Sequence, residues 1–180
     1  MDPSWREKRL VMRRSGSGAR KRRRASAFLG VFLLFSLCSA SEVRAQPAPT
    51  VQPRRDLTFE IVLPGVPKQV SRMDPSNSGM YRVQGRRNTE ISLSFSLPPD
   101  LLSASGQTLP VDFVAGDAGF SQEADQSASV GFDPNVPFVV RLNPDGRAWV
   151  WLGGTARPGA AQAADFYESG VVLTASYTGN

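Results

Sequence analysis

The side chains of this chain that could do chemistry are mainly carboxylates, and several lie in or near one Gly-, Ala- and Ser-rich stretch. They are Asp112, Asp117, Glu123, Asp125 and Asp133. Two carboxylates at a fixed separation can hydrolyse a glycosidic bond, and carboxylate oxygens in a loop can bind Ca²⁺. The spacing sets no two of them at a working separation, and the EF-hand pattern that would support a calcium site of Asp117, Glu123 and Asp125 is absent. A solvated acidic loop is therefore the favoured interpretation, and we expect no metal and no cofactor.

From residue 46 onward the sequence contains no histidine and no cysteine, since the single cysteine is Cys38. This composition excludes a Ser-His-Asp triad, a cysteine nucleophile and the usual zinc ligand sets from that part of the chain. Gly153-Gly154-Thr155 does not match a phosphate-binding loop, because neither a lysine nor a helix follows it. We therefore expect a protein that is not an enzyme.

Residues 138–155 give the clearest structural signal, and they carry two tryptophans. Residues 143–146, Asn-Pro-Asp-Gly, are typical of a tight turn, in which Pro presets φ and Gly adopts the left-handed conformation. We expect two paired strands around this turn, a β-hairpin. The expected cross-strand pairs are Leu142–Ala148, Val140–Val150 and Phe138–Leu152. These residues make one face of the hairpin apolar, which predicts that this face lies in the core.

The opposite face of the expected hairpin carries Val139, Arg141, Trp149 and Trp151, which we call the candidate interaction patch. In this register Arg141 lies directly across from Trp149 and can stack on it. Exposed aromatic side chains next to an apolar residue are typical of contact surfaces. The alternative is that a loop such as residues 115–135 covers the tryptophans, and the sequence favours neither.

Short segments of alternating apolar and polar residues recur between turn signals, and no segment shows helical spacing for more than about a turn. We expect strands at 57–63, near Val70, and at 81–83, 91–97, 109–113, 138–142, 147–152 and 171–177, with a brief patch at 130–132 inside a long loop over 115–135. This pattern predicts an all-β fold, an antiparallel immunoglobulin-like (pilin-like) sandwich of two sheets with seven to eight strands.

The first 45 residues are typical of a signal peptide with a long basic n-region. Ten lysines and arginines lie within residues 1–24, and the apolar run AFLGVFLLFSL that follows is short for a membrane span. Val43-Arg44-Ala45 predicts cleavage between Ala45 and Gln46. The alternative is an uncleaved N-terminal membrane anchor. Translation starts at either Met1 or Met12. We expect export to the periplasm, the cell surface or the extracellular space, with membrane contact only through the signal peptide.

After such a cleavage the chain has ten basic and thirteen acidic residues, so the formal charge of +5 becomes about −3. A role in nucleic-acid binding therefore loses its support. Residues 46–55, which contain three prolines, are expected to be a flexible lead-in, and residues 56–180 to be the β-sandwich domain.

Residues 146–155, GRAWVWLGGT, followed by Tyr167, Gly170 and the closing VVLTASYTGN, resemble a family. It is a bacterial family of exported, pilin-like proteins of unknown function, similar in style to spore coat protein U and to fimbrial subunits. Residues 56–59 and 79–85 extend the resemblance upstream. Glu60 departs from it, since the family usually has Gly after the Phe. The resemblance implies a surface or fimbria-like structural protein and implies no catalytic residues.

Two classes of function follow. The first is an exported structural or adhesive protein that binds copies of itself or another surface subunit, with a periplasmic chaperone as a further partner. The second is an exported carbohydrate-binding module or carboxylate-based glycan enzyme that uses Trp149, Trp151 and the loop carboxylates. We favour the first.

Overall fold

The structure is a computed structural model and describes residues 47–179. The signal peptide expected over residues 1–45 and its cleavage site between Ala45 and Gln46 therefore lie outside the described residues. Within the described part of the chain every regular element is a β-strand, and every paired neighbour is antiparallel. The expected all-β, antiparallel fold is confirmed at this level.

Thirteen short strands occur in residues 47–179, more than the seven to eight expected. They are β1 (Thr50–Arg55), β2 (Lys68–Val70), β3 (Gly79–Gln84), β4 (Glu90–Ser96), β5 (Asp100–Ser103), β6 (Thr108–Asp112), β7 (Ala118–Ser121), β8 (Val130–Phe132), β9 (Phe138–Arg141), β10 (Arg147–Leu152), β11 (Gly154–Ala156), β12 (Tyr167–Glu168) and β13 (Val172–Tyr177). The count is higher for two reasons. Single stretches of chain break into two strands, as β10 and β11 do at Gly153 and β4 and β5 do at Pro98-Pro99. Strands also form where none was expected, namely β1, β7 and β12.

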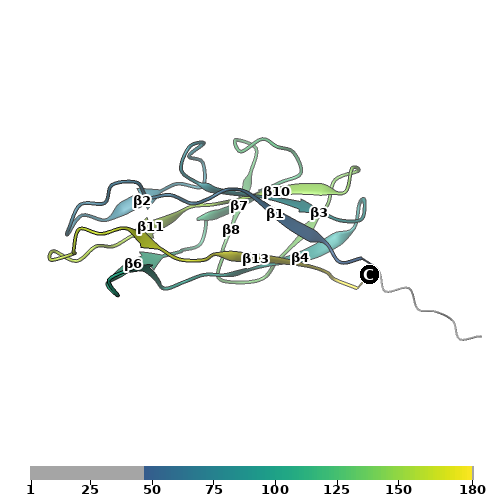
Figure 1. Ribbon diagram of the computed structural model, residues 1–180. Coiled ribbons are helices and arrows are strands. Elements are labelled where there is room, and N and C mark those ends of the chain that lie inside the picture. Colours follow the sequence, from purple (N-terminus) through teal and green to yellow (C-terminus); the bar gives the residue numbers. More distant parts are fainter. Residues whose placement is uncertain (1–46, 180) are drawn as a thin grey trace, which may run out of the picture. The chain divides into compact units, whose positions relative to one another are not determined.

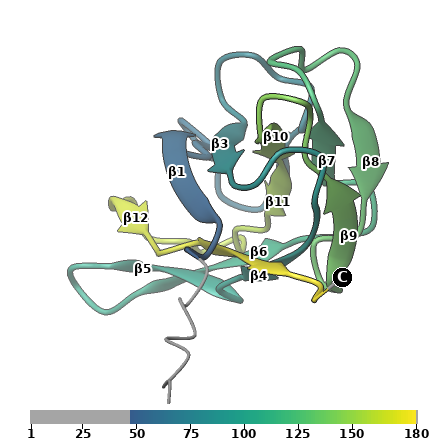
Figure 2. The same cartoon turned by 90° about the vertical axis from the view of Figure 1, so that its right-hand side faces the viewer.

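The strands form three sheets. The central sheet has the order β1-β3-β10-β7-β8, the opposing sheet β13-β4-β9, and the distal sheet β12-β5-β6-β11-β2. Figure 1 shows β2, β11 and β6 of the distal sheet at the left and β3 and β4 toward the right, near the C-terminus. Figure 2 shows β3, β10 and β7 on one side of the molecule and β4 and β13 on the other.

The central and opposing sheets face each other across a shared cluster of buried side chains, which we call the central core. Its buried members are Tyr81, Val83, Ile91, Leu93, Ala118, Phe132, Val140, Leu142, Ala148, Val150, Leu152 and Leu173. They come from alternate positions of strands in both sheets, as expected when one face of each strand is removed from water. Burying a side chain of this kind stabilises a fold by about 1.5–3 kcal/mol.

A smaller group of buried side chains, which we call the distal cluster, packs against the distal sheet. Its members are Phe59, Val70, Leu109, Val111 and Ala156. Phe59 comes from the irregular segment between β1 and β2, and the other four come from β2, β6 and β11. The distal cluster is thus covered by chain without regular structure.

The expected hairpin at residues 138–152 has the predicted strands and turn but not the predicted pairing. Gly146 has φ of 74°, and its N–H donates to the Asn143 carbonyl at 2.9 Å, as the turn requires. However, β9 pairs with β4 in the opposing sheet, whereas β10 pairs with β3 and β7 in the central sheet. The two strands therefore face each other across the central core. The alternation of apolar and polar residues correctly predicted which face of each strand lies in the core. It does not show whether the two strands pair in one sheet or lie in two sheets that face each other.

The expected flexible lead-in is wrong for residues 50–55. They form β1, which pairs with β3 from Thr50 opposite Gln84 to Arg55 opposite Met80, with an irregularity between Pro53 and Arg55. Proline is tolerated there because β1 lies at the edge of the central sheet. The β-structure therefore begins before residue 56.

Two further expectations are wrong. Residues 57–63 form no strand, because Glu60 has φ of 51° and breaks the extended backbone; Ile61 is 82% and Leu63 61% exposed. The loop expected over 115–135 contains β7, which pairs directly with β10. Its small residues, Ala118 and Gly119, gave no alternating pattern in the sequence.

Candidate functional site

The structure does not assemble the candidate interaction patch. Val139 and Arg141 are exposed on β9, in the opposing sheet, where Arg141 lies opposite Glu90. Trp149 and Trp151 lie on β10, in the central sheet. Because the two sheets turn their outer faces in opposite directions, Arg141 cannot lie across from Trp149. The patch prediction is wrong, and the cause is the pairing error in the expected hairpin.

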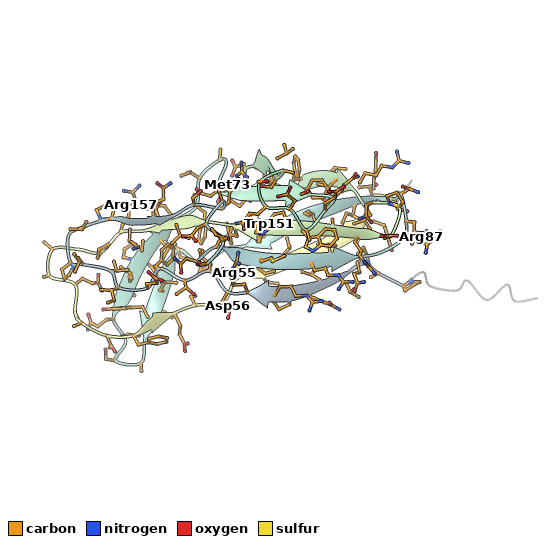
Figure 3. The ribbon with its side chains drawn as sticks, turned by 90° about the horizontal axis from the view of Figure 1, so that it is seen from above. Arg55, Asp56, Met73, Arg87, Trp151 and Arg157 are labelled. Atoms are coloured by element: carbon orange, nitrogen blue, oxygen red, sulfur yellow. The ribbon has the colours of Figure 1, made fainter. Side chains whose placement is uncertain are left out.

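Trp151 is on the outer face of the central sheet, as alternation predicted, but it is only 1% exposed. Its neighbours on β3 and β7 are Met80 and Gly119. A Cβ placed on Gly119 would lie 2.9 Å from Nη1 of Arg72 and 3.1 Å from Oγ of Ser129. Side chains from the two segments that follow β2 and β7 therefore lie over this part of the sheet. Figure 3 shows Trp151 in the middle part of the molecule.

Polar contacts hold these covering segments together. Arg72 donates from Nε to the Gly116 carbonyl at 3.1 Å and from Nη1 to Ser129 Oγ at 2.6 Å. Gln126 donates from Nε2 to Ser78 Oγ at 2.9 Å, and Arg55 of β1 donates from Nε to the Ser78 carbonyl at 2.6 Å. The alternative in which a loop covers the tryptophans is thus confirmed for Trp151. Trp149 is half-buried between Arg82 and Ser121.

Three of the carboxylates considered for catalysis make contacts within the chain. Asp112 forms an ion pair with Arg157. Asp125 accepts from Ser127, and Asp133 accepts from Asn135 at 2.9 Å. The contacts of Asp125 and Asp133 stabilise turns, whereas the ion pair of Asp112 joins β6 to the segment after β11.

Asp117 is the one buried carboxylate of that set, at 7% exposed. It accepts a hydrogen bond from the Val114 N–H at 2.8 Å, but burial raises its pKa above the usual value. Within residues 47–179 no three acidic side chains lie close enough to hold a metal ion. The calcium site of Asp117, Glu123 and Asp125 is therefore not assembled.

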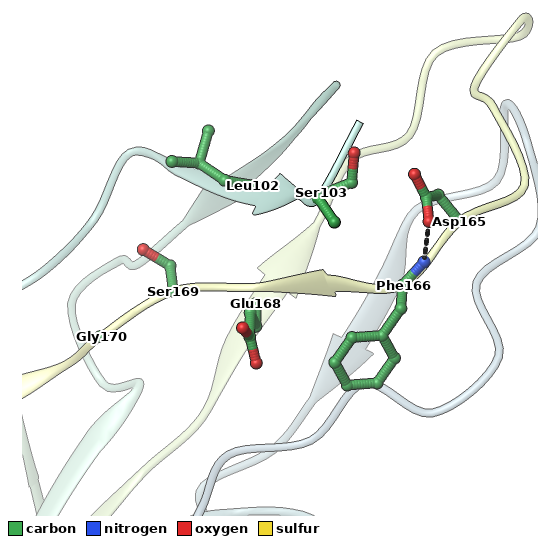
Figure 4. A pocket seen from close by; sticks show the side chains of 8 residues that line it. Leu102, Ser103, Asp165, Phe166, Glu168, Ser169 and Gly170 are labelled. Carbon is green, nitrogen blue, oxygen red and sulfur yellow. Dashed lines mark hydrogen bonds between the residues drawn. The ribbon is translucent and has the colours of Figure 1, made fainter. Parts of the chain in front are cut away.

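The structure instead offers an open hollow of about 610 Å³ at the distal sheet, which we call the distal pocket (Figure 4). It is lined by Leu102, Ser103, Ala104, Asp165, Phe166, Glu168, Ser169 and Gly170. The pairing of β12 with β5, Tyr167 opposite Ser103 and Glu168 opposite Leu102, brings its two walls together. Sequence reasoning missed this site. The available signal was the aromatic pair at 166–167 between two acidic residues, directly after a loop.

The chemistry of the distal pocket is apolar and anionic. Phe166 is 77% exposed, and Figure 4 shows its ring and the Glu168 carboxylate on the same side of the chain. Asp165 accepts hydrogen bonds from Ser105 Oγ at 2.6 Å and from the Phe166 N–H at 2.8 Å. These hydrogen bonds, chiefly the one from Ser105, lower the pKa of Asp165. Asp165 is therefore ionised at neutral pH. Such a surface suits a cationic group with apolar flanks.

Compared with known protein families and with curated proteins, the chain matches no family model and no curated sequence. In the part of the chain that the structure describes, no helix could cross a membrane.

Proposed function

We propose that this chain is an exported, non-catalytic structural or adhesive protein of the cell surface, similar to a fimbrial subunit. It acts by binding copies of itself or another surface subunit, with a periplasmic chaperone as a further partner. The observation that carries the proposal is a group of large apolar side chains exposed at the distal end of the fold: Ile61, Leu63, Val66, Leu102 and Phe166. Exposed apolar groups gathered in one region are typical of contact surfaces.

Hydrogen bonds support the placement of these side chains at one end. The Gly65 N–H donates to the Gly159 carbonyl at 3.0 Å, which joins the loop between β1 and β2 to the loop between β11 and β12. Tyr167 in turn donates from its hydroxyl to the Ala163 carbonyl at 2.9 Å, and it pairs with Ser103 of β5. Figure 1 shows the two loops side by side at the left.

The arrangement of sheets also supports an immunoglobulin-like, pilin-like sandwich. Two antiparallel sheets share the central core, and successive strands β9 and β10 cross from one sheet to the other, a connection that sandwiches use repeatedly. A domain of this class provides a rigid body on which surface loops make the contacts.

No observation favours the alternative, a carbohydrate-binding module or a glycan enzyme. A sugar-binding platform needs the faces of Trp149 and Trp151 open beside carboxylates, but Trp151 is buried, and Asp125 and Asp133 hold turns.

The test is to express the chain from Met1, so that any processing takes place, and to examine the exported product. We expect N-terminal sequencing to begin at Gln46 and sedimentation velocity to show association that increases with protein concentration. A product that retains residues 28–37 would contradict export by cleavage. A product that stays monomeric and hydrolyses or binds a polysaccharide would support the alternative function instead.

A further inference from the structure

The charges of this chain are separated along the fold. The distal sheet and its loops carry Asp56, Glu60, Asp100, Asp112, Asp165 and Glu168 against two basic residues, Lys68 and Arg157. The strands and short loops of the central and opposing sheets carry seven arginines: Arg54, Arg55, Arg82, Arg86, Arg87, Arg141 and Arg147. With Arg72, in the segment after β2, this part of the described chain has eight arginines against seven acidic residues: Asp74, Glu90, Asp117, Glu123, Asp125, Asp133 and Asp145. The two parts therefore have formal charges of −4 and +1.

These charges are hardly neutralised within the chain. Arg86 aside, the ion pair of Arg157 with Asp112 is the one salt bridge among residues 47–179. The side chains of Arg87 and Arg147 make no hydrogen bond or ion pair with the described residues, and Arg87, Arg141 and Arg147 are all exposed. Both signs of charge are thus available for contacts with another molecule.

The distal pocket has the groups that bind a guanidinium. The exposed Phe166 ring offers a face on which a planar guanidinium can stack, and the Glu168 carboxylate on the same side can accept two of its N–H groups. Leu102, 54% exposed, supplies an apolar wall for the side-chain stem. The residues that line the distal pocket include no lysine or arginine, so nothing in its lining competes for the site.

The arginines best placed to enter such a pocket lie on two connected loops at the other end, which we call the arginine end. The loop after β3 and the turn before β10 are joined by hydrogen bonds from the Gly85 N–H to the Gly146 carbonyl at 2.9 Å and from the Asn88 N–H to the Asn143 carbonyl at 3.3 Å. Arg87 is exposed in the first loop, and Figure 3 shows it far from Arg157. Arg86 lies over the Tyr177 ring, 5.9 Å from its centre.

The two sites lie at opposite ends of the same strands. The chain runs from Glu90, beside the arginine end, through β4 and β5 to Ser103, in the lining of the distal pocket. β13 runs back from the pocket side to Tyr177, whose hydroxyl accepts from the Arg86 N–H at 2.9 Å. A contact between two different ends of identical molecules does not close on itself unless the rotation closes a ring.

We propose that copies of this chain associate end to end, with Arg87 of one copy seated against Phe166 and Glu168 in the distal pocket of the next copy. The inference rests on the proposed function and names the interface of its self-association. The opposite charges of the two ends orient the approach, and the stacked ring and the carboxylate fix the arginine.

The experiment uses two charge reversals, Glu168→Arg and Arg87→Glu, each expressed from Met1, and measures association by sedimentation velocity. We expect each single variant to weaken association at least about tenfold, and the double variant to regain most of the wild-type association, because the charges are exchanged across the interface. Association of the wild type is also expected to weaken as salt is raised, since the contact is between exposed charges.

Matched controls separate the interface from the overall charge. Asp125→Arg and Arg54→Glu change the net charge by the same amounts at exposed positions. Asp125 lies beside Gln126, which is bonded to Ser78 over the central sheet, and Arg54 lies on β1, so neither belongs to the two sites. Both variants are expected to associate as the wild type does. If the wild type associates and both single reversals associate equally well, or if the double variant stays as weak as the singles, the interface is wrong while self-association stands. A wild type that is monomeric at every concentration overturns the interface and self-association together.

Discussion

The central core and the distal cluster are built from the same kinds of residue but are closed in different ways. The central core lies between two sheets and has twelve buried members. The distal cluster has five, and it is covered on one side by the irregular segment that holds Phe59. At that end Ile61, Leu102 and Phe166 remain exposed, whereas the exposed large apolar residues on the strands of the central and opposing sheets are three valines, Val130, Val139 and Val172. Most of the buried apolar side chains therefore lie in one part of the chain, and the largest exposed ones lie in the other.

This difference leads to an ordered set of expectations. Substitutions in or over the central sheet should lower stability strongly, substitutions of buried residues in the distal cluster should lower it less, and substitutions on the distal surface should change association while stability stays nearly the same.

The largest effect on stability is expected for Trp151→Ser. This tryptophan is 1% exposed between the central sheet and the segments that carry Arg72 and Ser129. Removing its ring leaves a large cavity, so the free energy of unfolding should fall by about 3–5 kcal/mol in urea titration. Trp149→Ser, at a half-buried position on the same strand, is the control and should cost less. Equal, small losses for both variants would contradict the cover described for Trp151.

The next effect compares the two clusters directly. Leu152→Ala removes a fully buried side chain from the central core and should cost about 3–4 kcal/mol, as an enclosed site cannot collapse onto the gap. Leu109→Ala, in the distal cluster, should cost about 2 kcal/mol, because the irregular segment can move inward. Urea titrations of both variants measure the difference. A distal loss as large as the central one would show that the segment holding Phe59 is as rigid as a sheet.

The stability of the fold should depend on pH through Asp117. This residue lies where the central and distal sheets meet, since its carbonyl accepts from the N–H of Gly153, between β10 and β11, at 2.8 Å. Burial raises the pKa of this carboxyl in the folded state, so the folded state holds its proton more tightly than the unfolded chain does. The stability that this carboxyl contributes is fully present below about pH 4, which is the ordinary pKa of an Asp side chain. It is lost as the pH rises through the raised pKa of the folded state.

The measurement is the free energy of unfolding of wild type and Asp117→Asn across pH 3 to 8. The wild type should lose stability relative to the variant as pH rises through that window. The variant is needed as a reference because two other carboxyls change stability in the opposite direction as pH rises. The pKa of Asp74 is lowered, chiefly by the hydrogen bond from the Ser76 N–H, and that of Asp125 is lowered, chiefly by the hydrogen bond from Ser127. A difference that does not depend on pH would show that Asp117 is not buried.

The smallest effect concerns the irregular cover of the distal cluster. Glu60 has φ of 51°, a left-handed conformation that costs a residue with a Cβ about 1 kcal/mol. Glu60→Gly should therefore raise the free energy of unfolding by about 0.5 kcal/mol, after the greater freedom of glycine in the unfolded chain is subtracted. Asn88→Gly, at φ of 54°, is the control and should change little, since Asn tolerates this conformation. A loss of stability for Glu60→Gly would mean that the Glu60 side chain makes a contact of its own.

The strands could be predicted where one face is buried and the other is solvated. β3, β4, β6 and β13 all follow the expected alternation, and the turn before β10 follows from its Pro and Gly. β1 was not predicted, because proline is acceptable only in a strand at the edge of a sheet. Whether a strand lies at an edge depends on which other strands pair with it. β7 was not predicted, because the small residues Ala118 and Gly119 show no alternating pattern. Gly119 is small because Arg72, which is distant in the sequence, occupies the space over it.

The candidate site was less predictable, because it depends on contacts between distant segments. The face of Trp151 was correct, but its burial depends on segments some twenty to eighty residues away in the chain, as the partners Arg72 and Ser129 show. The distal pocket depends on the pairing of the two-residue strand β12 with β5, and no local pattern indicates so short a strand.

The passage of single chain segments between sheets has a mechanical consequence. β10 continues into β11 through Gly153, and β4 continues toward β5, so the same backbone supports both the central core and the distal cluster. There is no room for a side chain at the joint, since a Cβ on Gly153 would lie 2.3 Å from the Val70 carbonyl oxygen. A pulling force applied at the two ends would run along these strands and load their inter-strand hydrogen bonds together, in shear, so that the body would yield as one unit instead of opening strand by strand.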